Sequence, residues 1–172
     1  MISRKMALEQ YELNPLLNWS GATYINALQK LEHGKTRLLL GQDTVSYMCF
    51  EHLLKPIERA WRNRRVLLDP GTGGHYGVYS KVMLKRKSDL FFMLDFDDFN
   101  SQHTHTSIET LFRVVCKRVK YRQDYSERLV SSFRKSEFVY GGQKVGFSAG
   151  TLNTGHRATT FINTILNAAY II

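Results

Sequence analysis

The sequence predicts an α+β fold, in which helices and strands follow one another without the regular alternation of a doubly wound sheet. Three segments favour this class: an apolar strand at residues 90–96, an amphipathic helix from Thr106 to about Tyr121, and a hairpin at 137–150 around Gly141-Gly142. With 172 residues, 43% of them hydrophobic, the chain is long enough for one domain with a buried core.

The first predicted element is a helix from Ala22 to Leu31, where the apolar residues recur at helical spacing. The stretch Glu32-His33-Gly34 interrupts this pattern. Residues 35–40, which end in three leucines, are then predicted to form a short strand.

A second helix is predicted over residues 45–61. Asp43 and Thr44 precede it and have the short polar side chains that cap helices. Pro56 lies in its second half and predicts a kink or a break, because proline lacks the N–H group that the helix needs. The glycine-rich stretch 69–74 is predicted to be a loop.

The second half of the chain begins with the strand at 90–96, which is apolar on both faces and is therefore predicted to be central in a sheet. Thr106 and Glu109 fit a capping box at the start of the next helix. The expected inner face of that helix is Ile108, Leu111, Phe112, Val115 and Val119. The last helix is predicted from about Arg157 to Ile171, and its expected buried face is Ala158, Phe161, Ile162, Ile165 and Leu166.

The charge balance indicates a polyanionic partner. The chain has 24 Lys and Arg against 15 Asp and Glu, a formal charge of +9, which attracts nucleic acid but also fits an ordinary soluble basic protein. Its two cysteines, Cys49 and Cys116, show no metal-binding spacing and indicate a reducing compartment. No secretory signal is expected, because the N-terminal residues have no apolar segment behind them. No apolar run has the length of a membrane span, so a cytosolic chain without a membrane partner is expected.

Carboxylates cluster where the predicted central strand ends. Asp95 is at its C-terminal end, with Asp97 on the same side of an extended chain and Asp98 on the other. Carboxylates suit Mg²⁺, so metal-assisted phosphoryl transfer is one hypothesis. A solvated acidic turn and a phosphatase site are the alternatives, whereas the spacing of a calcium loop is absent. His103 and His105 offer two imidazoles to zinc, but no third ligand follows at a suitable spacing.

A glycine-containing loop runs into the last helix. Thr154 and Gly155 lie in this loop, and Thr159 and Asn163 follow in the helix. The latter two are four residues apart, so they share one helix face, away from the apolar stripe. Taken alone, the pattern also fits a core helix that follows a glycine turn.

A basic strand lies upstream, at residues 30–38. Lys35 and Arg37 alternate along it and are expected to project to the same side. Two such cations suit a triphosphate, although basic surface strands are common and the glycine spacing of a Walker loop is missing. Further basic residues are candidates for an RNA channel or for solvated charge: Arg62, Arg64, Arg65, Lys81, Lys85, Arg86 and Lys87.

Together and in this order, the segments Lys30–Leu38, Leu90–Asn100 and Gly150–Asn163 resemble three motifs of viral RNA-directed RNA polymerases, most closely those of totivirus-like double-stranded RNA viruses. The resemblance implies a fragment of a right-hand polymerase, with residues 1–88 in the fingers region and 89–172 as a partial palm. The implied activity is nucleotidyl transfer from a nucleoside triphosphate to an RNA 3′ end on an RNA template, in viral replication and transcription.

The resemblance also implies roles for single residues. Asp95 and the main-chain carbonyl of Phe96 would bind Mg²⁺, with Mn²⁺ as an alternative. Lys35 and Arg37 would hold the triphosphate. The remaining nucleotide-binding residues would be Asn100, Thr154, Gly155, Thr159 and Asn163, with Gly155 supplying a flexible backbone. Many such enzymes have aspartate where Asn100 stands, but an amide also donates and accepts hydrogen bonds at a ribose hydroxyl. A reverse transcriptase is expected to have a bulky aromatic residue there.

The implied partners are an RNA template, a primer or product strand, nucleoside triphosphates and a viral capsid protein, and the implied location is the virion and host cytoplasm. The family's Gly-Asp-Asp motif is expected after the helix of Asn163 but is absent, so we expect a fragment that is inactive alone. The alternative is a non-catalytic RNA-binding relic of a viral polymerase. A capsid or assembly protein is a third hypothesis, but it leaves the motifs of Asp95 and Gly155 without a role.

Overall fold

In the computed structural model, residues 6, 15–32, 34–63, 66–68, 74–85 and 96–171 are described. Their strands form a four-stranded sheet in the order β2-β1-β3-β4, with β1 (Thr23–Glu32), β2 (Lys35–Gln42), β3 (Ser136–Tyr140) and β4 (Gln143–Phe147). The helices are α2 (Thr44–Ala60), α3 (Gly74–Lys85), α4 (His105–Arg118), α5 (Gln123–Ser132) and α6 (Thr159–Ile171). Short 3-10 helices are η1 (Pro15–Leu17), η2 (Phe99–Gln102) and η3 (Phe133–Lys135).

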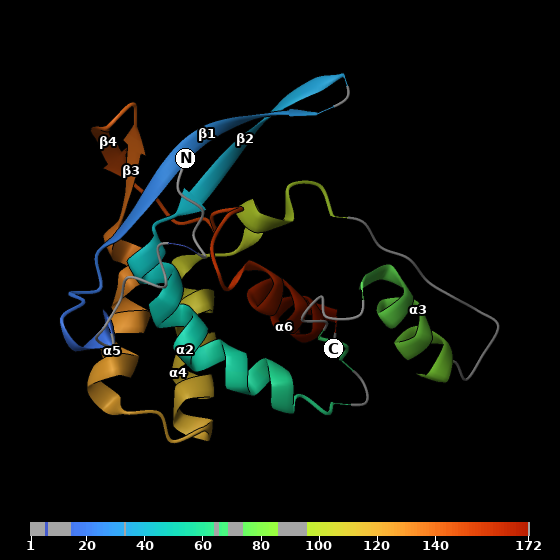
Figure 1. The fold of residues 1–172 in the computed structure, drawn as a ribbon. Coiled ribbons are helices and arrows are strands. Elements are labelled where there is room, and N and C mark those ends of the chain that lie inside the picture. Colours follow the sequence, from blue (N-terminus) through green and yellow to red (C-terminus); the bar gives the residue numbers. More distant parts are fainter. Residues whose placement is uncertain are drawn as a thin grey trace.

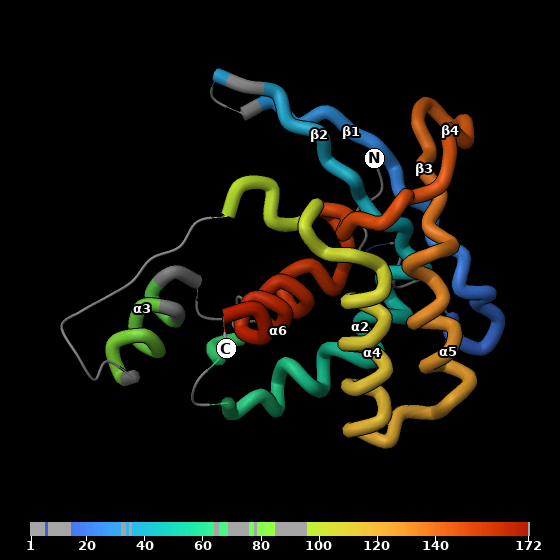
Figure 2. Tube along the Cα trace, turned by 180° about the vertical axis from the view of Figure 1, so that it is seen from behind, coloured from blue at the N-terminus to red at the C-terminus, as the bar shows by residue number. Residues whose placement is uncertain are grey.

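This mixture of helices and strands agrees with the predicted α+β class. Figure 1 shows α2, α4, α5 and α6 gathered on one side of the sheet. The ribbon of Figure 1 and the tube of Figure 2 both show α3 apart from these helices.

The helix predicted from Ala22 to Leu31 is wrong, because this segment is strand β1. It pairs antiparallel with β2 along most of its length, through a turn at Gly34 with φ +79°. The strand predicted at 35–40 is confirmed as β2. The apolar residues of β1 do recur at helical spacing, but pairing with the neighbouring strand overrides that local pattern.

The hairpin predicted around Gly141-Gly142 is confirmed as β3 and β4. Its two glycines have φ values of 57° and 81°, and positive φ at both central residues is what a tight hairpin turn requires. β3 also runs parallel to β1. Strands from both sides of residue 88 therefore share one sheet, while the division into fingers and palm regions stays a prediction.

Helix α2 begins as predicted, with Asp43 as its cap. Asp43 Oδ1 accepts a hydrogen bond from the Ser46 backbone N at 2.9 Å, and Oδ2 accepts one from the Tyr24 backbone N at 2.9 Å. One carboxylate thus fixes both the start of α2 and its junction with β1. The helix continues unbroken through Pro56, so a break is excluded, and Figure 1 shows its axis turning along its length.

Helix α4 begins at His105, so the capping box predicted at Thr106 is wrong. Thr104 is the cap, and its Oγ1 accepts a hydrogen bond from the Ser107 backbone N at 3.1 Å. The expected inner face packs on the core except for Val119, which is 45% exposed after the helix has ended.

The last helix, α6, starts at Thr159 rather than at Arg157, and its expected buried face is confirmed, with Ile165 partly buried. Helices α3 and α5 were not predicted. The strand expected at 90–96 lies outside the described residues except for Phe96, and the loop at 69–74 does so except for Gly74, the first residue of α3. Four of the candidate RNA-channel cations also lie outside the described residues: Arg64, Arg65, Arg86 and Lys87. Lys85 ends α3, but its side chain is not described.

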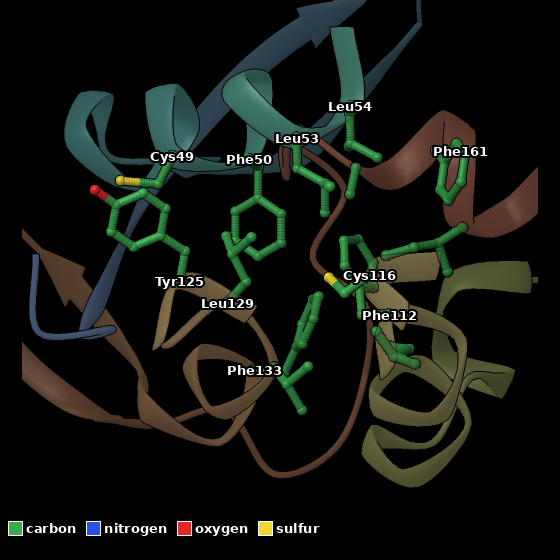
Figure 3. Close-up of a cluster of buried hydrophobic side chains, with 14 of the residues drawn as sticks. Cys49, Phe50, Leu53, Leu54, Phe112, Cys116, Tyr125, Leu129, Phe133 and Phe161 are labelled. Atoms are coloured by element: carbon green, nitrogen blue, oxygen red, sulfur yellow. The ribbon is translucent and has the colours of Figure 1, made fainter. Parts of the chain in front are cut away.

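The core is organised around Phe50 of α2. Its ring makes edge contacts with Phe112 of α4 at 5.5 Å and with Phe133 of η3 at 5.4 Å between centroids. Figure 3 shows Phe50 pointing from α2 into the space lined by Tyr125 and Leu129 of α5. Buried aromatic contact therefore joins helices from both halves of the chain. Within the described ranges, none of the helices has the length and apolar character needed to cross a membrane.

Replacing Asp43 by alanine is expected to lower the free energy of unfolding by about 1–2 kcal/mol, because the N–H groups of Ser46 and Tyr24 lose their acceptor. Urea unfolding of the chain measures the change. Asp43→Asn retains an amide oxygen for Ser46 and should lose less. Equal losses in the two variants would contradict the capping role.

Candidate functional site

A chain of side-chain hydrogen bonds joins η2 to α6. The amide nitrogen of Asn163 donates to Asn100 Oδ1 at 2.9 Å, and His103 Nε2 lies 3.0 Å from Asn163 Oδ1. The Leu152 backbone N also donates to the Asn100 carbonyl at 3.2 Å. The two asparagines that the resemblance assigned to one task are therefore in direct contact, although 63 positions separate them.

Gly155 lies directly on the end of strand β2. Its backbone N donates to the Leu40 carbonyl at 3.0 Å, and it forms a parallel bridge with Gly41. A Cβ at this position would lie 2.5 Å from the Leu40 oxygen and 2.9 Å from the Gly41 Cα. The glycine is therefore required for close backbone approach. The flexible backbone expected here is, in this structure, hydrogen-bonded to β2.

The two threonines of the motif differ in what they contact. Thr154 is exposed, and its Oγ1 accepts a hydrogen bond from the Leu40 backbone N at 3.4 Å. The Thr159 hydroxyl donates within its own loop, to the carbonyl of His156 at 2.8 Å or of Asn153 at 3.0 Å. A hydroxyl has one proton, so Thr159 can meet a ligand only as an acceptor while this contact lasts.

Arg157 fastens the same loop to α2, a role that was not predicted from the sequence. Its side chain is 12% exposed; Nε donates to Glu51, while the two terminal nitrogens meet the Glu58 carboxylate at 3.0 and 2.6 Å. Burial opposes the charge, but the hydrogen bonds to Glu58 and Glu51 raise the pKa of the guanidinium. Glu51 and Glu58 are seven residues apart and so lie on one helix face, which is the signal that sequence reasoning could have used.

His156 is buried between this loop and the core. Its Nδ1 accepts a hydrogen bond from the Ala158 backbone N at 3.0 Å, and its ring lies 4.4 Å from the ring of Phe50 between centroids. Burial, with the neighbouring charge of Arg157 as a second cause, lowers the pKa of His156 to about 3. The imidazole is therefore neutral across the physiological pH range.

The acidic motif is described only in part. Asp95 lies outside the described residues, whereas Phe96 lies in irregular backbone just before η2. Asp97 and Asp98 form an exposed turn, in which Asp98 adopts φ 42°. The described ranges contain no group of three or more His, Cys, Asp or Glu arranged to hold a metal. Both ring nitrogens of His103 contact side-chain groups, so the structure lends no support to zinc there.

Strand β2 carries the basic motif at its start and the Gly155 contact at its end. Lys35 is placed by its backbone pairing with Glu32, but its side chain is not described. Arg37 is exposed and lies opposite Lys30 in the β1–β2 register. Leu40, which contacts the motif loop, is three residues beyond Arg37, roughly 10 Å along a strand.

Fold and site together define a basic, mixed α/β chain in which the two predicted sugar-contacting asparagines are already paired. This is the class of protein that the polymerase resemblance predicts. The sequence profile for viral RNA-directed RNA-polymerase matches residues 2–172, and the chain therefore belongs to this family.

Relatives with similar sequences carry the same description. The chain is 46% identical over 172 residues to the probable RNA-directed RNA polymerase of Leishmania RNA virus 1 - 1, covering 98% of the chain and 20% of the relative. It is 40% identical over 169 residues to that of Helminthosporium victoriae virus-190S, with coverage of 98% and 20%. The probable polymerase of Saccharomyces cerevisiae virus L-A is 29% identical over 151 residues, 83% of the chain and 10% of the relative. The chain thus spans about a fifth of the length of its two more similar relatives. No solved structure matches it significantly.

Gly155→Ala is expected to lower the free energy of unfolding by about 1–3 kcal/mol, because the new Cβ would overlap the backbone of β2. Chemical denaturation measures this loss. Gly77→Ala is the matched control: its Cβ meets nothing within 4 Å in helix α3, so stability should stay level or rise by up to about 1 kcal/mol. If Gly155→Ala changed the free energy of unfolding no more than Gly77→Ala does, the close backbone approach at Gly155 would not contribute to stability.

Acid should destabilise the chain through His156. Its folded-state pKa is about 3, below the ordinary value near 6.5, so the unfolded state binds the proton more readily. The stability that the neutral ring contributes is complete above about pH 6.5 and is lost as the pH falls toward 3. Between pH 7 and 5 the wild type should lose about 2 kcal/mol more than His156→Asn, which retains an acceptor for the Ala158 N–H.

Urea unfolding at both pH values tests this expectation. His52→Asn, changed at an exposed histidine, controls for the loss of a histidine as such. Parallel pH dependences for the wild type and His156→Asn would show that His156 is not the responsible group.

Proposed function

We propose that this chain supplies the fingers strand and the front of the palm of a right-hand RNA-directed RNA polymerase. The observation that carries the proposal is the 2.9 Å hydrogen bond from Asn163 to Asn100. It joins the acidic motif to the loop-helix motif at the two amides that the family resemblance assigns to the nucleotide sugar. The match of the viral polymerase profile to residues 2–172 supports the same assignment.

The chain's own residues have chemistry suited to a ribonucleotide. Lys35 and Arg37, near the start of β2, would neutralise the triphosphate, and the planar guanidinium can bind two phosphate oxygens at once. Asn100 and Asn163 would contact the ribose hydroxyls, because an amide offers both a donor and an acceptor. Thr159 would accept a hydrogen bond on the same helix face, and Thr154 and Gly155 would position the loop on β2.

Divalent metal fits the donors that precede η2. The Asp95 carboxylate and the Phe96 carbonyl are hard oxygen ligands, as Mg²⁺ and Mn²⁺ prefer, and the exposed carboxylates of Asp97 and Asp98 keep this turn acidic. When bound, the metal would activate the attacking 3′-hydroxyl and neutralise the triphosphate. The remaining metal carboxylates belong, on this proposal, to a Gly-Asp-Asp segment encoded beyond residue 172, without which the chain is inactive.

The proposed partners follow from this activity. They are an RNA template, a primer or product strand, nucleoside triphosphates and a viral capsid protein, with the virion and host cytoplasm as the location. The relatives of Leishmania RNA virus 1 - 1 and Helminthosporium victoriae virus-190S are each named probable RNA-directed RNA polymerase. The formal charge of +9 suits an RNA partner.

Asp95→Asn should reduce RNA primer extension by at least about a hundredfold in the polymerase expressed from the complete source reading frame, because a metal carboxylate is lost. Asp98→Asn is the matched control. Its carboxylate is exposed and its φ of 42° is one that asparagine readily adopts, so extension should stay near the wild-type rate.

Sequencing the source RNA downstream of codon 172 decides between the polymerase and the non-catalytic relic. A Gly-Asp-Asp segment in frame supports the polymerase. A reading frame without this segment, together with RNA binding that needs neither magnesium nor Asp95, would support the non-catalytic RNA-binding relic. Extension that survives Asp95→Asn would overturn the metal assignment.

A further inference from the structure

His103 is a fully buried polar residue with a role that neither the motifs nor the relatives assign. It follows η2, has no solvent exposure, and places both ring nitrogens against side chains of α6. Nε2 lies 3.0 Å from Asn163 Oδ1, and Nδ1 lies 3.2 Å from the Tyr170 hydroxyl. A buried imidazole with two defined partners is held in one orientation.

Aromatic rings enclose the same imidazole. The Phe99 ring lies edge-on to His103 at 4.6 Å between centroids, and the Phe96 ring stacks on Phe99 at 4.5 Å. The Tyr170 ring lies 5.8 Å from His103 between centroids. The His103 ring therefore connects Phe96, whose carbonyl is a proposed metal ligand, with Tyr170 in the last turn of α6.

The hydrogen-bond chain has a direction. Burial lowers the pKa of His103, with the hydrogen bond to Asn163 opposing it, so the imidazole is neutral and carries one N–H. Asn163 Oδ1 can only accept, so the proton is on Nε2, and Nδ1 accepts from the Tyr170 hydroxyl. Asn163 then has its NH₂ group toward Asn100 Oδ1, which is the donor direction at 2.9 Å. At the end of this chain the Asn100 side-chain oxygen is engaged as an acceptor, and its own NH₂ group is left as the donor.

We propose that His103 and Tyr170 are positioning residues that fix the amides of Asn163 and Asn100, so that Asn100 presents an N–H donor to the ribose 2′-hydroxyl of the incoming nucleotide. This role rests on the proposed polymerase function. Sugar selection by this chain depends on which end of the Asn100 amide faces the nucleotide, and His103 sets that end through its tautomer. A reversed chain would present the amide oxygen instead.

The tautomer is tested first, on the chain itself. In ¹⁵N-histidine-labelled protein, the His103 signals are identified by their loss in His103→Gln, and the ring nitrogen shifts report which nitrogen is protonated. The expected result is a neutral ring protonated at Nε2. A ring protonated at Nδ1 would reverse the chain and overturn the proposal.

Sugar selection is tested in the polymerase expressed from the complete reading frame, as the ratio of kcat/KM for a ribonucleotide and the matching deoxyribonucleotide. His103→Leu removes the donor to Asn163 and should lower this ratio about tenfold, the value of one hydrogen bond. His103→Gln retains an amide donor and should recover part of the ratio. Tyr170→Phe removes the hydroxyl partner of His103 at a half-exposed residue and should lower the ratio about threefold. Tyr140→Phe, at an exposed tyrosine beside the turn of the β3–β4 hairpin, is the control.

The outcomes separate the two proposals. A wild-type polymerase that extends no RNA primer would overturn the polymerase function, and the sugar-positioning role with it. A second outcome would contradict the positioning role alone. In it, the wild type extends RNA normally, His103→Leu lowers kcat/KM equally for both nucleotides, and Tyr170→Phe changes neither value. His103 would then have only a structural role. A lowered ratio in both variants, with the control at the wild-type value, supports the positioning role.

Discussion

The backbone contact between Gly155 and strand β2 is the constraint on which the candidate site depends. Three consecutive residues fasten the loop to different parts of the fold: Gly155 to β2, His156 to the core at Phe50, and Arg157 to α2. Helix α6 starts two residues later, so its origin and direction are set before its first turn. The position of Asn163 opposite Asn100 follows from this anchoring, because a rigid helix transmits the placement of its start.

The site contains one largely buried ion-paired cation and two buried neutral imidazole rings. Arg157 meets two carboxylates, and burying such charges is favourable only where every partner is in place. His103 and His156 are kept uncharged by burial, so each contributes one donor and one acceptor. Net charge attracts RNA over a distance, whereas these groups fix hydrogen-bond geometry at short range. The cations that attract RNA are exposed on the surface, whereas the hydrogen-bonded groups that fix the geometry are largely buried.

The sequence predicted those elements whose local signals agree with their tertiary setting. The hairpin at Gly141-Gly142, the Asp43 cap and the buried stripe of α6 all have local causes. β1 has no such local cause: the spacing of its apolar residues predicts a helix, but its pairing with β2 makes it a strand. In the site, the pairing of Asn100 with Asn163 agrees with the motif order. The role of Arg157 was missed, since its partners lie about a hundred residues upstream, and the engaged hydroxyl of Thr159 depends on the loop conformation. Asp95 remains a prediction.

The distance along the chain between β2 and the loop that pairs with its C-terminal end has a consequence for synthesis. Gln42 and Arg157 are hydrogen-bonded across 115 positions. A ribosome adds roughly 5–20 residues per second, so β2 is made on the order of ten seconds before its partner loop. The β1–β2 hairpin can form at once, because its contacts are local. The end of β2, however, has no partner on its outer edge until the Gly155 loop has been synthesised. Until the loop arrives, the nascent protein presents an uncovered strand edge of the kind that mispairs with other chains.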